Sequence, residues 1–152
     1  DIPAYTYIRL GNLYRVTGVF DSAAWYYEAA LSSLKGQPEG ATLSSAFYNM
    51  GQLQMETGNY HDALLNTKKS LVIRTHTQDT LSMAECWRAL GNIAKNMGDY
   101  LEARTHFDNI LDVGNRFDDP ELQMFASIHL GEMDFLERNL VGAMEHLSDG
   151  LE

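Results

Sequence analysis

The chain has 152 residues, of which 45% are hydrophobic, and its formal net charge at pH 7 is −10. No apolar run approaches the roughly 18 residues that a membrane span requires. Residues 77–152 carry fifteen acidic and five basic side chains, whereas residues 1–76 carry six of each. This acidic second half disfavours nucleic acid and anionic membranes as partners. The single cysteine, Cys86, excludes an internal disulfide and fits a reducing, cytoplasmic compartment, and we expect it to pack inside a helix.

Helical signals follow one another along the whole chain. The first helices are expected at about 3–17 and 21–34, and a glycine- and proline-containing break follows at 35–40. The next pair is expected at 41–57 and 60–76. Asp79 is a predicted N-cap for a helix that ends at Met97, and a further helix follows from Tyr100. Asp118-Asp119-Pro120 signals another helix start. The last pair is expected at 120–137 and 140–152.

Two small residues recur in step every forty positions. Glycine stands at 11, 51, 91 and 131, and alanine stands at 23, 63, 103 and 143. A fixed period of this kind indicates a stacked array of repeated units. The glycines allow a second helix to approach closely, which offsets their helix penalty of roughly 0.8–1.0 kcal/mol. Further glycines at 18, 58 and 98 fit the left-handed position that ends a helix, but Arg138 replaces the fourth.

The best-formed copy runs from Trp87 through Leu90-Gly91-Asn92, Gly98-Asp99-Tyr100 and Ala103 to Phe107. Asp99 and Glu102 in it form a predicted capping box. This pattern resembles the tetratricopeptide repeat family. The resemblance implies an all-α fold, a right-handed α-α superhelix that forms a single array over 1–152. Its four helix-turn-helix repeats would lie at about 4–37, 41–77, 79–117 and 119–152. The long period is similar to that of Pins-type adaptors, kinesin light chains and bacterial Rap or MalT-like regulators.

The resemblance also implies a ligand-binding concave face lined by the first helix of each pair. The corresponding peptide-binding candidates are Tyr5, Ile8, Asn12, Arg15, Tyr48, Gln52, Arg88, Asn92 and Lys95. The three carboxamides among them share one repeat position, where each can pair with a peptide backbone or simply face solvent. Arg88 and Lys95 either grip a carboxylate or pair with neighbouring acids. The carboxylate clamp of Hsp70/Hsp90 co-chaperones is rejected, because Ile8 and Gln52 replace its lysine and asparagine.

An apolar stripe on the last repeat is a candidate interface. It consists of Phe125, Ile128 and Phe135, and such a patch marks an interaction surface when it is exposed. We expect a following helix or a second copy of the chain to cover it, in preference to a peptide. Self-association through this repeat is therefore a candidate property of the protein.

Catalysis finds no support in the sequence. The five histidines are far apart and lack metal-ligand spacing, and no P-loop, G-x-S-x-G or cysteine–histidine signature is present. We therefore predict no catalytic residues, no metal and no cofactor. The main hypothesis is a non-catalytic scaffold that binds a protein or peptide partner in its concave groove. The alternatives are a regulatory or sensor segment of a bacterial signalling or transcription protein, and a structural array that self-associates.

Overall fold

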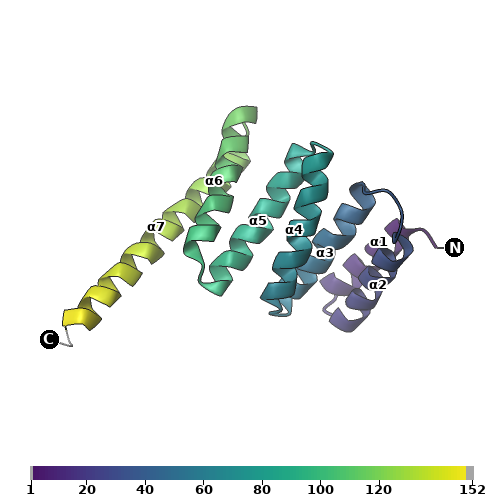
Figure 1. The fold of residues 1–152 in the computed structure, drawn as a ribbon, viewed down its shortest axis with the longest axis horizontal. Coiled ribbons are helices and arrows are strands. Elements are labelled where there is room, and N and C mark those ends of the chain that lie inside the picture. Colours follow the sequence, from purple (N-terminus) through teal and green to yellow (C-terminus); the bar gives the residue numbers. More distant parts are fainter. Residues whose placement is uncertain (1, 150–152) are drawn as a thin grey trace.

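The protein is a row of helices stacked in chain order (Figure 1). The computed structural model describes the backbone of residues 2–149 and the side-chain surroundings of residues 2–139 and 141. Over these residues it is an all-helical solenoid, which confirms the predicted fold class. The helices are α1 (Ala4–Val16), α2 (Phe20–Ser33), α3 (Ala41–Glu56), α4 (Tyr60–His76), α5 (Thr80–Met97), α6 (Tyr100–Phe117) and α7 (Pro120–Asp149).

The recurring glycines and alanines lie where the two helices of a pair meet, as the sequence predicts. A Cβ atom added to Gly91 would lie 2.6 Å from the Phe107 ring, and Gly11 and Gly51 face α2 and α4 equally closely. The alanines at 23, 63 and 103 have no exposed surface. Small side chains at both positions therefore set the distance between paired helices.

Helix ends also follow the predicted signals. Gly18, Gly58 and Gly98 have φ angles of 78°, 80° and 81°, a left-handed conformation that suits glycine. Asp79, the predicted N-cap, accepts a hydrogen bond from Ser82 N at 3.2 Å. Asp99 accepts one from Glu102 N at 3.0 Å, but the reciprocal half of the capping box is absent because Asp99 N donates to the Ala94 carbonyl at 2.9 Å.

The predicted fourth helix pair is wrong. In place of helices at 120–137 and 140–152, α7 runs without interruption from Pro120 to Asp149 and projects beyond the array (Figure 1). Arg138 stands where the other repeats have their left-handed glycine, so nothing in the backbone stops the helix. Gly131 is exposed, with no atom near its Cβ position. Ala143 lies outside the residues whose side chains are described.

The first helices of the pairs form the inner layer. Helix α3 packs against both α1 and α5. The backbones of the second helices α2, α4 and α6 lie further apart within the described residues, where the Lys68–Glu102 ion pair links α4 to α6. The buried apolar side chains gather into clusters over α1–α3 and over α5–α7. Helix α4 contributes to none of these clusters. No helix in the described part of the chain is both long and apolar enough to cross a membrane.

Candidate functional site on the concave face

The inner layer carries a hollow between α1 and α3. A cavity of about 250 Å³ is lined by Tyr5, Ile8, Arg9, Ala41, Thr42 and Ser45. Ile8 is only 7% exposed and forms the floor, whereas Tyr5 is 59% exposed and stands at the rim. Arg9 makes no ion pair with any described residue. This hollow therefore combines an apolar floor with a cation and hydroxyl groups at its edge.

The hollow continues towards the start of α1. A second cavity of about 640 Å³ shares Tyr5 and Thr42 with the first and extends to Ser33 and Gln37. The two cavities are therefore adjacent, and we call them together the groove between α1 and α3. Its open lining mixes apolar side chains with hydroxyl and carboxamide groups, which suits an extended peptide segment better than a small molecule that must be enclosed.

Two predicted binding residues of α1 are occupied by contacts inside the array. Asn12 Oδ1 accepts a hydrogen bond from the Tyr27 hydroxyl at 2.6 Å. Burial raises the pKa of Tyr27, which keeps this donor protonated. Arg15 pairs with Glu56 of α3. Asn12 and Arg15 therefore help to hold the helices together, and only their remaining polar atoms are available to a ligand.

The central part of the face is built on Tyr48 of α3. The guanidinium of Arg74 lies 4.7 Å from the centre of the Tyr48 ring, and burial raises the pKa of that phenol. Gln52 is half-buried one turn further along α3, beside Tyr48. Both side chains are half-buried on a first helix, and their part in peptide binding stays a prediction.

The predicted cationic pair on α5 is not free. Arg88 stacks on the Phe125 ring at 4.2 Å, and Lys95 Nζ pairs with Glu132 Oε2 at 3.0 Å. Lys95 and then His129 lower the pKa of Glu132, because both contacts favour the charged carboxylate. Asn92, between the two cations, is half-buried and makes no side-chain hydrogen bond with a described residue. The expectation that neighbouring acids neutralise this cluster is confirmed for Lys95.

The apolar stripe of α7 divides into a packed and an exposed part. Phe125 is half-buried, with its ring 6.1 Å from that of Phe107 and 4.4 Å from that of His129, so it belongs to the α6–α7 contact. Ile128 and Phe135 are 61% and 65% exposed. The predicted interface stripe therefore loses Phe125 and keeps the other two residues.

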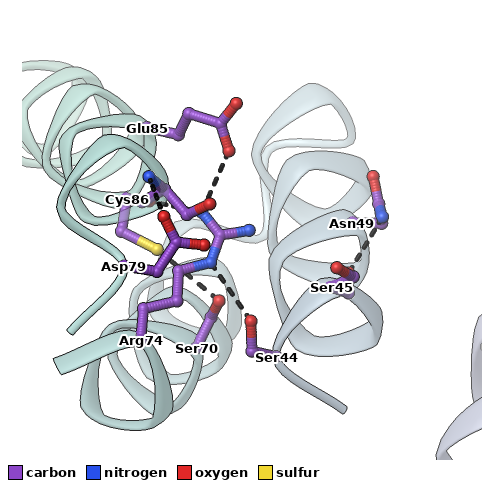
Figure 2. Close-up of polar contacts among 9 residues, drawn as sticks. Ser44, Ser45, Asn49, Ser70, Arg74, Asp79, Glu85 and Cys86 are labelled. Carbon is purple, nitrogen blue, oxygen red and sulfur yellow. Dashed lines mark hydrogen bonds and ion pairs between the residues drawn. The ribbon is translucent and has the colours of Figure 1, made fainter. Parts of the chain in front are cut away.

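A buried polar cluster joins α3, α4 and α5, and the sequence analysis missed it. Its centre is Arg74, which is 6% exposed. The guanidinium donates to Ser44 Oγ at 3.1 Å, to Glu85 Oε2 at 3.0 Å and to the Ser82 carbonyl (Figure 2). Cys86 is fully buried beside it and contacts Ser70 Oγ at 3.5 Å. We call this cluster, Ser44, Ser70, Arg74, Glu85 and Cys86, the polar joint.

The sequence carries a signal for the polar joint. Ser70 and Arg74 stand forty residues after Ala30 and Leu34, so polar residues occupy repeat positions that are apolar in the first repeat. Ser44 likewise corresponds to Ala84. A comparison of the buried positions between repeats would have revealed it.

The described residues offer no reactive arrangement. They contain no group of three or more histidine, cysteine or acidic side chains that could hold a metal ion. Burial raises the pKa of the Cys86 thiol, which disfavours the reactive thiolate.

Comparison with known proteins supports the fold. No family model and no curated protein matches the sequence. Among solved structures, the N-terminal domain of stress-induced protein-1 from C. elegans is similar, with a TM-score of 0.65. The match covers 83% of this chain and 93% of that one at 20% sequence identity. At this identity the likeness concerns the arrangement of the helices.

Proposed function

We propose that the protein is a non-catalytic interaction scaffold that binds a peptide or an extended partner segment along its inner face. The observation that carries this proposal is the groove between α1 and α3, where Tyr5, Arg9, Thr42 and Ser45 surround a hollow of about 250 Å³. Helical arrays present such inner surfaces because neighbouring repeats rotate slightly against each other. A cytoplasmic location, proposed from the single buried cysteine, is compatible with this role.

The contacts inside the array shift the expected anchor towards the first repeats. Arg15 and Lys95 are neutralised by glutamates, and Arg88 is stacked on Phe125. Arg9 is the exposed cation at the groove, so we propose that it meets an acidic side chain or a terminal carboxylate of the partner. Ile8 would contact an apolar side chain at the groove floor.

The carboxamides then have unequal roles. Asn12 already satisfies the Tyr27 hydroxyl, so its replacement would destabilise the first repeat as well as affect binding. The Asn92 side chain makes no hydrogen bond with a described residue, and we propose that it pairs with the partner backbone further along the inner face.

A displayed peptide library selected on the protein tests the proposal. The selected peptide should bind Arg9→Ala and Asn92→Ala more weakly than the parent, by roughly five- to tenfold for each lost hydrogen bond. Lys69→Ala is the matched control, because Lys69 is an exposed cation on α4 in the outer layer and should leave binding unchanged. Equal affinity of all three variants, with helicity intact, would remove the inner face as the binding site.

A further inference from the structure

The outward face of α7 has the form of a helix-docking surface. Met124, Ile128, Gly131 and Phe135 follow one another at spacings of four, three and four, which places them on one side of the helix. Met124, Ile128 and Phe135 are 61–65% exposed. The opposite side of α7, with Leu122, Ala126 and Met133, is buried in the α5–α7 cluster.

Gly131 marks this face as one that another helix should cover. In each of the three preceding repeats, the corresponding glycine is in tight contact with a side chain of the next helix. That helix begins nine residues after the glycine, as at Gly91 and Tyr100. Of these four recurring glycines, Gly131 alone has open space at its Cβ position. Within the described residues, the array thus ends on a surface that has the glycine for close helix packing but no helix packed against it.

No segment of the described residues covers this face. Helix α7 continues for 18 residues beyond Gly131 to Asp149. At 1.5 Å per residue, this carries the chain about 27 Å away from the glycine before it can turn back. A helix of a second molecule can pack against this face without a turn in the chain.

We propose that this face binds the same face of a second copy of the chain, with the two α7 helices antiparallel. If Ile128 lies opposite Gly131 of the other copy, then Met124 lies opposite Phe135, and both contacts occur twice by symmetry. Each Ile128 side chain fills the open space over a glycine, as Tyr27 does over Gly11.

Charge complementarity selects the second copy as the occupant. Glu121 precedes Met124 by three residues and Arg138 follows Phe135 by three, and both are exposed. In the same antiparallel alignment each Glu121 therefore lies opposite an Arg138 of the other copy. The stripe is thus complementary to itself in both shape and charge. A single helix face forms a small interface, so we expect a reversible dimer in the micromolar range.

Sedimentation equilibrium of the protein and of Gly131→Leu tests the dimer. The new side chain meets open space in the single protomer but separates the helices in the dimer, so it should weaken association by more than about tenfold while helicity is unchanged. Glu28→Leu is the control, because it adds the same side chain at an exposed position of α2. A parent protein that stays monomeric at high micromolar concentration overturns the proposal, as does a Gly131→Leu dimer of parental affinity.

Reversal of the two charges tests the antiparallel alignment. Glu121→Arg and Arg138→Glu should each weaken the dimer severalfold by placing like charges together, and the double variant should recover the parental affinity. A double variant as weak as the single ones contradicts the alignment. None of these residues lines the groove between α1 and α3, so selected peptides should bind all the variants equally, which separates this inference from the proposed function.

Discussion

Two contacts between neighbouring repeats use equivalent backbone positions but different side chains. The first joint connects the first and second repeats, and the middle joint connects the second and third. In the first joint these positions are apolar, with Ala30 fully buried and Leu34 9% exposed. In the middle joint they carry Ser70 and Arg74, which are held by hydrogen bonds. Apolar contact is nondirectional, whereas a buried polar group needs a partner in a defined place. The middle joint therefore fixes the angle between α4 and α5 more strictly than apolar packing would.

The polar joint also reaches the inner face. The Arg74 guanidinium donates to Ser44 of α3 and to Glu85 of α5, and the ring of Tyr48, a predicted binding residue on α3, lies against it. The arrangement of α3 relative to α5 thus depends on one side chain. The following variants test how far this contrast between the joints extends.

Removal of the Arg74 side chain should have the largest effect. Arg74→Ala leaves a cavity and unpaired polar groups, among them the Ser82 carbonyl, and should cost about 2–4 kcal/mol of unfolding free energy. Urea denaturation followed by circular dichroism measures the loss. Glu85 is largely exposed and can be hydrated after its partner is lost, so it adds little.

A compensated variant separates polarity from packing. Conversion of the joint to the chemistry of the first repeat, by Ser44→Ala, Ser70→Ala and Arg74→Leu together, should recover much of the stability. The two buried hydroxyls are removed along with their partner, and only the Ser82 carbonyl still lacks the guanidinium donor. If Arg74→Ala unfolds at the parental urea concentration, the polar joint does not hold α4 and α5 together.

A glycine pair should show that the close helix–helix contact of the third repeat is absent at the equivalent glycine of α7. Gly91→Ala pushes a methyl group into the Phe107 ring and should cost about 1–3 kcal/mol. Gly131→Ala meets open space and should stabilise its helix by up to about 1 kcal/mol. Thermal unfolding of the two variants measures the difference. Equal effects of the same sign would mean that the next helix does not rest on Gly91.

His106 should give the array a pH dependence near neutrality. This residue lies on α6 beside the Lys68–Glu102 ion pair that links α6 to α4, and burial lowers its pKa despite the nearby Glu102. The unfolded chain then binds the proton more readily, so stability should fall as the pH drops below the ordinary histidine pKa of about 6.5.

His106→Phe should flatten this dependence, as measured by urea denaturation above and below that pH. The exposed His76 supplies the control, since His76→Phe should leave the slope in place. A parental slope in His106→Phe would assign the effect to another group.

The Lys95–Glu132 pair should contribute least. Its carboxylate is 41% exposed, so Glu132→Gln should cost only about 0.2–1 kcal/mol and less at high salt. Because the pKa of Glu132 is lowered in the fold, this contribution is present above the ordinary glutamate range and is lost as pH falls through the lowered value. Denaturation at two salt concentrations measures it, and a loss as large as that of Arg74→Ala would contradict the difference between surface and buried contacts.

The periodic residues predicted the fold because each has one mechanical role. Gly91 must lie under a neighbouring helix, and Gly98 must end one, so their spacing identified both the pairs and the turns. The same rule explains the wrong prediction at the fourth repeat. The prediction followed the repeat period past Arg138, although the residue that ends the helix is absent there.

The candidate site was harder to predict because side-chain pairing is not periodic. Tyr5 lines the groove, whereas Lys95 is neutralised by Glu132. Nothing in the repeat spacing indicates this pairing, because the two residues stand 37 positions apart. Arg9 was left out of the predicted set although it lines the groove. Repeat spacing indicates which face a residue occupies, whereas its availability depends on neighbours that are distant in sequence.

Mapping of a selected peptide onto the protein by backbone amide NMR shifts tests the account most directly. We expect the shifts to concentrate on α1 and α3 around Tyr5, Arg9 and Ser45, and to continue onto α5 at Asn92. Shifts confined to the outer helices α2, α4 and α6 would contradict the assignment of the inner face as the binding surface.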